Sequence, residues 1–218
     1  MEPAVLGEYY TVAGTGTAEI VDRRSRFLGA VAPAADEQEA QAFLAEIRRE
    51  HWEARHHVYA YVVEGGRIRR CSDDGEPQGT GGKPVLDVVQ GAELMQCVAV
   101  VTRYFGGILL GTGGLVRAYS HAAARAVEAA GRVCMKPCVL METVCDYAQY
   151  GRLLPYIAAS GGTVEDTVFA EGVSLRFRLP EDESARFEKG LADLTAGTVS
   201  ARVTGYRHVA YPADPAGK

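Results

Sequence analysis

The sequence lacks the long apolar run that a membrane-spanning helix requires. Among its 218 residues no stretch approaches the roughly 18 consecutive apolar residues of such a helix. The most apolar segment, residues 100–116, is interrupted by Arg103 and several glycines. Its first residues also show no basic segment followed by an apolar one, which a secretory signal would contain. We therefore expect a cytoplasmic protein with no membrane contact.

Cysteine is scarce and odd in number. The five cysteines lie at positions 71, 97, 134, 138 and 145, scattered through apolar segments. A disulfide-stabilised fold would have paired cysteines at regular spacing. Cys134, Cys138 and Cys145 are weak candidates for a zinc site, because a strand pattern runs through them. We expect reduced, structural thiols and no resident metal.

Positive charge is also in deficit, since the formal net charge is −5. A net acidic chain argues against nucleic-acid binding over the whole surface. Locally the balance is different. Residues 97–136 contain five basic residues and only Glu128 as an acid, a difference of +4. This asymmetry directs attention to the segment that holds Arg103 and Arg117.

The patterns of apolar residues, turns and helix caps predict an α+β protein of two domains. In the first half, residues 18–32 are typical of one strand, and Asp36 with Glu39 predicts the start of a helix over about 36–50. Further strands are expected at 57–63, 67–71 and 96–104. Helices are expected at 84–94, with Pro84 in the first position, and at 115–130, with Gly131 as the stop signal.

The second half, after Lys136-Pro137, predicts the order β-α-β-β-α-β. This is the split βαβ arrangement of a ferredoxin-like domain. We therefore place the domains at 1–136 and 137–218. Pro155 falls inside the first helix of the second domain and predicts a kinked or short helix there.

Nucleotide-binding motifs fail in both glycine-rich segments. The stretch from Pro77 to Pro84 has no glycine at the first P-loop position and no hydroxyl after Lys83. The pattern G-x-G-x-x-G ends in Pro84 when started at Gly79 and in Val116 when started at Gly111. We expect no nucleotide cofactor.

An anion site is the more general possibility. Gly111, Gly113 and Gly114 follow a buried strand and directly precede a helix, so that backbone N–H groups and the positive helix end could point outward together. Arg117 would add a formal charge. The alternative is that the glycines only permit a tight strand-to-helix turn.

The acidic loop allows two interpretations as well. Asp73, Asp74 and Glu76 could hold a hard cation or supply a base. Alternatively, these carboxylates pair with Arg69, Arg70 or Arg103. Of the neighbouring histidines, His56 and His57 start a strand on opposite faces, so only one of them can face a site.

Three segments carry a resemblance to a known family. They are Cys71-Ser72-Asp73-Asp74-Gly75-Glu76-Pro77-Gln78-Gly79-Thr80-Gly81-Gly82-Lys83-Pro84, Val100 to Gly111 with its Arg103-Tyr104-Phe105-Gly106-Gly107 core, and Gly114 to Ser120. Together they resemble the YigZ/IMPACT family over roughly residues 17–130, including the strand that contains His56. Gln78 and Gly81 stand where many relatives have Ser and Ala. The second half is similar in pattern to the C-terminal domain of bacterial YigZ-type members.

The resemblance implies a first domain of the βαβ type shared by a ribosomal protein domain and by domain IV of elongation factors, followed by a ferredoxin-like domain. It also implies a regulatory protein that acts on translation through RNA or a ribosome-associated partner, since the eukaryotic member binds the activator of a starvation-sensing kinase. Some members are labelled proline dipeptidases, but no ordered set of Asp, His and Glu ligands occurs here.

Three functions follow as hypotheses. The first is a non-enzymatic protein that binds RNA phosphate or a ribosomal partner, with no catalytic residues. The second is a metal-assisted hydrolase of a phosphate ester or small anion that uses Asp73, Asp74 and Glu76. The third is a protein-docking face. The residues expected to bind are Lys83, Arg103, Gly106, Gly107, Gly111, Gly113, Gly114 and Arg117, and the accompanying motif residues are His56, Ser72, Asp73, Asp74, Gly75 and Glu76.

Overall fold

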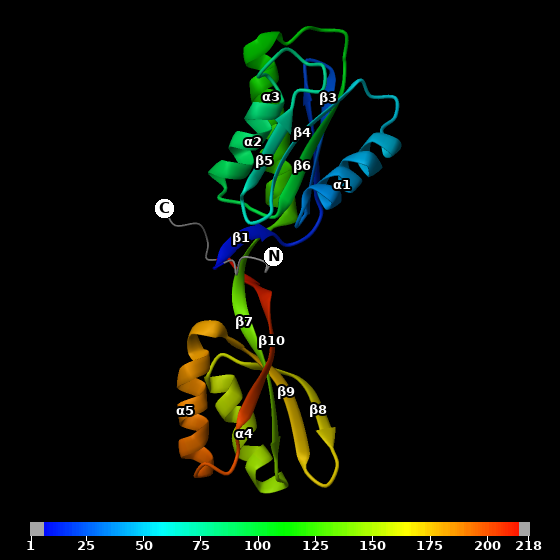
Figure 1. The fold of residues 1–218 in the computed structure, drawn as a ribbon. Coiled ribbons are helices and arrows are strands. Elements are labelled where there is room, and N and C mark those ends of the chain that lie inside the picture. Colours follow the sequence, from blue (N-terminus) through cyan, green and yellow to red (C-terminus); the bar gives the residue numbers. More distant parts are fainter. Residues whose placement is uncertain (1–6, 214–218) are drawn as a thin grey trace. The chain divides into compact units, whose positions relative to one another are not determined.

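The computed structural model describes residues 7–213 and contains two sheets with helices packed on them (Figure 1), which makes the protein α+β. Two compact units can be distinguished. One contains residues 9–134 and 210–213, and the other contains residues 7–8 and 135–209. Lys136 and Pro137, the predicted boundary, lie inside the strand β7 (Arg132–Cys145).

The sheet of the first unit is antiparallel between all the neighbours whose register is given, with the strand order β2-β3-β6-β4-β5. Its strands are β2 (Gly16–Asp22), β3 (Ser25–Pro33), β4 (His56–Val63), β5 (Ile68–Ser72) and β6 (Cys97–Tyr104). β6 is central and is buried on both faces. Because neither face of this strand contacts water, apolar side chains are favoured at every position, which agrees with its continuous apolar sequence.

Helices cover the two faces of this sheet. α1 (Glu37–Glu50) packs on one face, and α2 (Gly82–Gly91) with α3 (Gly111–Ala130) packs on the other (Figure 1). Asp36 caps α1, as predicted, by accepting a hydrogen bond from the backbone N–H of Glu39 at 2.8 Å. Gly131 ends α3 with a positive φ, also as predicted.

The prediction of one strand over residues 18–32 is wrong. The chain turns between β2 and β3 at Arg23 and Arg24, whose φ angles are 44° and 67°. Asp22 pairs with Ser25, so the turn has only two residues. Arginine is rarely found in this left-handed region, where two-residue turns favour Asn and Gly. The sequence Arg23-Arg24 therefore does not predict a turn.

Two helices begin earlier than predicted. Pro84 is the third residue of α2 rather than the first. Gly111, Gly113 and Gly114 form the first turn of α3 rather than a loop before it. Glycine is a poor helix former, so the sequence does not predict a helix at these positions. Tertiary packing determines where the helix begins.

The second unit contains the predicted order of elements. It follows β7 with α4 (Tyr147–Ala159), β8 (Thr163–Phe169), β9 (Val173–Pro180), a 3₁₀ turn at Glu181–Glu183, α5 (Ser184–Thr195) and β10 (Ala201–Pro212). β10 pairs with β7, the strand that runs through both units, and so does β1 (Tyr9–Val12). α4 runs through Pro155, so the predicted shortening does not occur. Within residues 7–213, none of the helices is long and apolar enough to cross a membrane.

Candidate binding site

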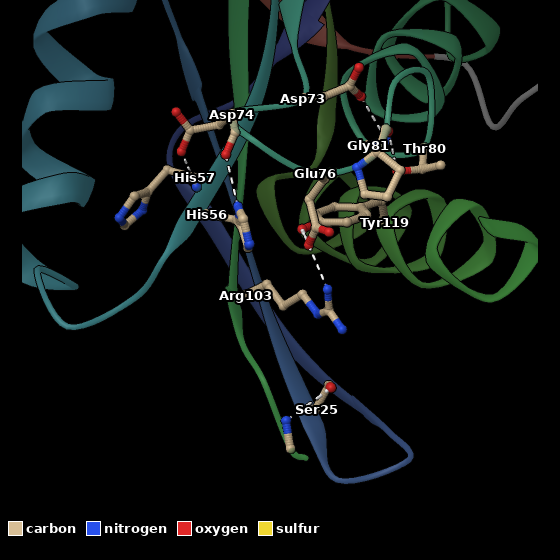
Figure 2. A network of polar contacts seen from close by, with 12 residues as sticks. Ser25, His56, His57, Asp73, Asp74, Glu76, Thr80, Gly81, Arg103 and Tyr119 are labelled. Carbon is tan, nitrogen blue, oxygen red and sulfur yellow. Dashed lines mark hydrogen bonds and ion pairs between the residues drawn. The ribbon is translucent and has the colours of Figure 1, made fainter. Parts of the chain in front are cut away.

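The motif residues gather at one end of the first unit's sheet. The end of β6, the start of β4, the start of β3 and the loop 73–81 supply the residues there (Figure 2). The register explains this meeting, because Arg103 of β6 lies opposite both Phe27 of β3 and His56 of β4. The antiparallel pairing therefore brings three separate motifs of the sequence to one place.

Asp73 organises the glycine-rich loop. Its carboxylate accepts hydrogen bonds from the backbone N–H groups of Gly79, Gly81 and Gly82 at 2.7, 2.9 and 2.8 Å. Burial raises the pKa of Asp73, but these three donors outweigh it and the pKa is lowered overall. The ionised side chain thus fixes the conformation of the loop.

Asp74 holds the two histidines in place. Its carboxylate accepts from the backbone N–H of His57 at 2.6 Å and pairs with Arg48 at 2.9 Å. Its carbonyl oxygen accepts from Nδ1 of His56 at 2.8 Å. Since a carbonyl can only accept, Nδ1 of His56 carries the hydrogen and Nε2 is the acceptor in the neutral ring.

The two histidine rings point to opposite sides of β4 (Figure 2). His57 is buried, and its Nδ1 lies 3.1 Å from the hydroxyl oxygen of Thr102. Burial lowers the pKa of His57, while the nearby Asp74 carboxylate opposes the shift. His57 therefore belongs to the packed interior, and only His56 faces the site.

Glu76 and Arg103 form a buried ion pair. Oε1 of Glu76 accepts from the Arg103 guanidinium at 2.7 Å and from the Tyr119 hydroxyl at 2.7 Å, and the side chains of Arg103 and Glu76 are only 7% and 4% exposed. Burial and the bond to Glu76 raise the pKa of Tyr119 far above its ordinary value. The Arg103 guanidinium lies 5.5 and 5.4 Å from the ring centres of Phe27 and Phe105.

The three carboxylates of the motif consequently point apart. Asp73 faces its own loop, Asp74 faces β4 and α1, and Glu76 faces Arg103 and Tyr119 (Figure 2). Among residues 7–213, no group of three His, Cys, Asp or Glu residues is arranged to hold a metal ion. The ligand set that the hydrolase hypothesis requires is therefore not formed by these side chains. Ser72 contributes a hydroxyl oxygen that accepts the N–H of Asp74 at 3.1 Å.

The predicted glycines have different structural roles. Gly75, Gly107 and Gly111 have positive φ angles of 86°, 84° and 71°. Gly106 is pressed against the β2–β3 turn, where an added Cβ would lie 2.0 Å from the backbone of Arg24. Its N–H donates to the Ser25 hydroxyl oxygen at 3.1 Å. By contrast, an added Cβ on Gly113 would meet nothing within 4 Å.

A groove of about 580 Å³ opens beside these residues. Its lining residues are Glu53, Ala54, Arg55, His56, Arg103, Tyr104, Phe105 and Leu109. Close by, the residue before α3, Leu110, makes no side-chain hydrogen bond that caps the helix. Arg23 reaches the same place, because its guanidinium donates to the Leu109 carbonyl oxygen at 3.4 Å.

The basic segment 97–136 is largely compensated by acids from elsewhere in the sequence. Arg103, Arg125, Arg132 and Lys136 pair with Glu76, Glu128, Glu93 and Glu8 respectively. Only Arg117 of that segment has no carboxylate partner within residues 7–213. Lys83 is likewise paired, with Asp87. The charge difference of +4 counted along residues 97–136 is thus mostly compensated by ion pairs in the folded protein.

Uncompensated arginines lie instead at the end of the sheet described above. Arg23, Arg24 and Arg55 are exposed, and in the described part of the chain none of them pairs with a carboxylate. Sequence reasoning missed these three residues. The doublet Arg23-Arg24 could have been found only by identifying a two-residue turn between two alternating apolar runs.

Comparison with known sequences places the chain in a family. The family model of the Impact N-terminal domain matches residues 23–127, and the model of a domain of unknown function, DUF1949, matches residues 143–198. The sequence is 38% identical over 194 residues to the IMPACT family member YvyE of Bacillus subtilis, which covers 88% of this chain and 89% of that protein. The chain therefore belongs to the IMPACT family, as its three motifs predicted.

Other relatives agree with this assignment. The IMPACT family member YigZ of Escherichia coli is 36% identical over 81% of this chain and 88% of its own length. The mouse Protein IMPACT is 34% identical over 42% of this chain and 30% of its own length. A crystal structure described as that of a hypothetical protein superposes with a TM-score of 0.60 and 33% identity, covering 90% of this chain and 97% of the other.

Proposed function

We propose that this protein is a non-enzymatic regulatory protein that acts on translation by binding RNA phosphate at the end of its first sheet. The observation that carries the proposal is a group of exposed arginines without a carboxylate partner within residues 7–213. Arg23 and Arg24 lie in the β2–β3 turn, and Arg55 lines a groove of about 580 Å³. In a chain with a net charge of −5, such a set marks one localised face for an anionic partner.

The electrostatics of the groove support an anion. Arg55 is the cation of the lining that has no carboxylate partner within residues 7–213, Arg23 reaches the neighbouring Leu109 carbonyl oxygen, and the uncapped start of a 20-residue helix lies next to the groove. Helix N-termini favour negative groups, because their backbone N–H groups and dipole point toward the ligand. Arg103 takes a different role from the predicted one. Its charge is already matched by Glu76, so it shapes the groove and the exposed arginines meet the phosphates.

The finer domain assignments form part of the same proposal. We assign residues 1–136 to the βαβ type shared by a ribosomal protein domain and elongation-factor domain IV, and residues 137–218 to the ferredoxin-like type. The order β7-α4-β8-β9-α5-β10 supports the second assignment. Both types suit a cytoplasmic protein that works on the translation apparatus, with no resident cofactor.

The proposal is tested by the affinity for RNA at low salt. The probe is a fluorescently labelled RNA hairpin with a single-stranded tail, and binding is followed by anisotropy. Arg23→Ala combined with Arg55→Ala is expected to weaken binding about tenfold or more, since two charged contacts are lost.

A matched control is available in the same unit. Arg67 and Arg69 are exposed arginines of the β4–β5 hairpin, at the other end of the sheet; Arg67 pairs with Glu64 there, and Arg69 has no carboxylate partner within residues 7–213. Their double alanine variant removes the same charge and is expected to bind RNA as the parent does. Absence of binding by the parent protein at low salt would contradict the proposal, as would equal losses in both double variants.

A further inference from the structure

Two aromatic residues are exposed at this end of the chain's first unit, one on the groove lining and one next to a lining residue in the sequence. Phe105 lines the groove and is 54% exposed. Trp52, the only tryptophan of the chain, is 76% exposed in the turn just before Glu53, which also lines it. Leu109 on the same lining is 80% exposed. Exposed apolar side chains that gather in one patch with a polar rim are typical of interaction sites.

These aromatic groups stand among the uncompensated arginines. Arg55 lies between Trp52 and His56 in the chain, and Arg23 hydrogen-bonds to the Leu109 carbonyl oxygen. The Arg103 guanidinium lies 5.4 Å from the Phe105 ring centre. The Nε of Arg103 has no hydrogen-bond partner among residues 7–213 although it is buried.

We propose that this groove binds a single-stranded segment of RNA, with an unpaired base stacked on Phe105 or Trp52 and the neighbouring phosphates held by Arg23 and Arg55. The inference rests on the proposed function and defines its ligand more closely. Alternating cations and exposed aromatic rings are the arrangement that accepts unpaired bases, because every base has a face that can stack.

The size of the groove agrees with this ligand. A volume of about 580 Å³ falls within the range of about 300–1,000 Å³ of small-ligand sites. Such a groove admits a base that has left its helix, but not the body of a duplex. Duplex RNA would present only phosphates and 2′-hydroxyls to the rim and would leave Phe105 without a contact.

The experiment compares two RNAs with equal numbers of phosphates, an oligouridylate and a blunt-ended duplex, by anisotropy at low salt. The parent protein is expected to bind the oligouridylate more tightly. Phe105→Leu keeps an apolar side chain at an exposed position and is expected to weaken oligouridylate binding about 5- to 150-fold, the range for loss of one stacked base. Binding of the duplex is expected to stay the same.

The matched control is Phe169→Leu, because Phe169 is 57% exposed in the other unit. It is expected to change neither affinity. Trp52 supplies a second readout, since its fluorescence is the only tryptophan signal of the chain. Quenching by the oligouridylate but not by the duplex supports stacking near the groove.

The outcomes separate the two proposals. If the duplex binds as tightly as the oligouridylate and Phe105→Leu has no effect, the groove recognises phosphate alone; the stacking inference is then wrong while the proposed function stands. If neither RNA binds at low salt, both are wrong, and an acidic protein segment becomes the ligand to test.

Discussion

The buried pair of Arg103 and Glu76 is a structural interaction at the centre of a binding site. Both side chains are shielded from water, and the Tyr119 hydroxyl completes the coordination of the carboxylate oxygen. Two charges removed from water are stable only as a pair, because each alone would lose its solvation without compensation. Arg103 therefore contributes to the groove through its position rather than as a free cation.

This pairing predicts a large effect of one substitution. Glu76→Gln leaves the Arg103 charge buried without its counterion, and we expect a loss of about 3–5 kcal/mol in the free energy of unfolding. Urea denaturation measures it. The double variant Glu76→Leu with Arg103→Met is expected to be as stable as the parent or more stable by up to about 1–4 kcal/mol, because it removes both charges. Equal stability of Glu76→Gln and the parent would show that the pair is not coupled.

Asp73 predicts a pH-dependent contribution to stability. Its pKa is lowered in the folded state by the three N–H donors of the loop. Its contribution is therefore complete above the unfolded-state pKa of about 3.9 and is lost as the pH falls through the lower folded-state value. Asp73→Asn is expected to cost about 1.5–3 kcal/mol at pH 7. The difference from the parent should shrink below about pH 4, as urea denaturation at both pH values would show; a constant difference would contradict this assignment.

At the scale of elements, the β2–β3 hairpin combines strain with function. Arg23 and Arg24 both occupy the left-handed region, in which Asn and Gly are favoured for a two-residue turn. The arginines are retained at a cost in stability and present two charges beside the groove. Strained residues of this kind cluster at functional sites.

A substitution should separate these two effects. Arg23→Asn with Arg24→Gly is expected to raise the free energy of unfolding by about 1 kcal/mol, because the strain is relieved. The same variant is expected to bind RNA more weakly. Thermal or urea denaturation and anisotropy on one preparation measure both. If the variant is less stable than the parent, or binds RNA with the same affinity, the two arginines do not lower stability while contributing to binding.

Two glycines, one between β6 and α3 and one in the first turn of α3, differ in how closely the chain packs around them. An added Cβ at Gly106 would collide with the Arg24 backbone, whereas at Gly113 it meets open space. Gly106→Ala is expected to destabilise the protein by at least about 2 kcal/mol. Gly113→Ala is expected to leave it unchanged or to stabilise it by up to about 1 kcal/mol. Denaturation of the two variants side by side tests this, and the reverse order would refute the packing described for Gly106.

The elements themselves were largely predictable where the sequence pattern is local. Asp36 and Glu39 predicted the start of α1, and the buried run of β6 predicted a strand covered on both faces. The turn at Arg23 and the start of α3 at Gly111 were missed. In both places the backbone conformation is imposed by neighbouring elements against the residues' own preferences, and a single sequence does not report such packing.

At the scale of the whole molecule, the distribution of charge depends on pairing across the sequence. The basic segment 97–136 is compensated by Glu76, Glu93 and Glu8, which lie outside it. Conversely, Arg23 and Arg55 come from separate parts of the chain, and only the fold brings Arg23 to Leu109 on the groove that Arg55 lines. A sum over consecutive residues indicates neither effect. The family was identifiable from its motifs, but the residues proposed to meet the ligand required the fold.

The salt dependence of RNA binding shows directly whether Arg23 and Arg55 bind phosphate groups. Binding constants of the parent, of the Arg23→Ala/Arg55→Ala variant and of the Arg67→Ala/Arg69→Ala control would be measured over a series of salt concentrations. Each phosphate contact contributes about 0.9 to the slope of log K against log salt for duplexes and about 0.7 for single strands. We expect the slope of the first variant to be shallower than that of the parent by about 1.4–1.8 and the slope of the control to equal that of the parent. Identical slopes for all three proteins would contradict it.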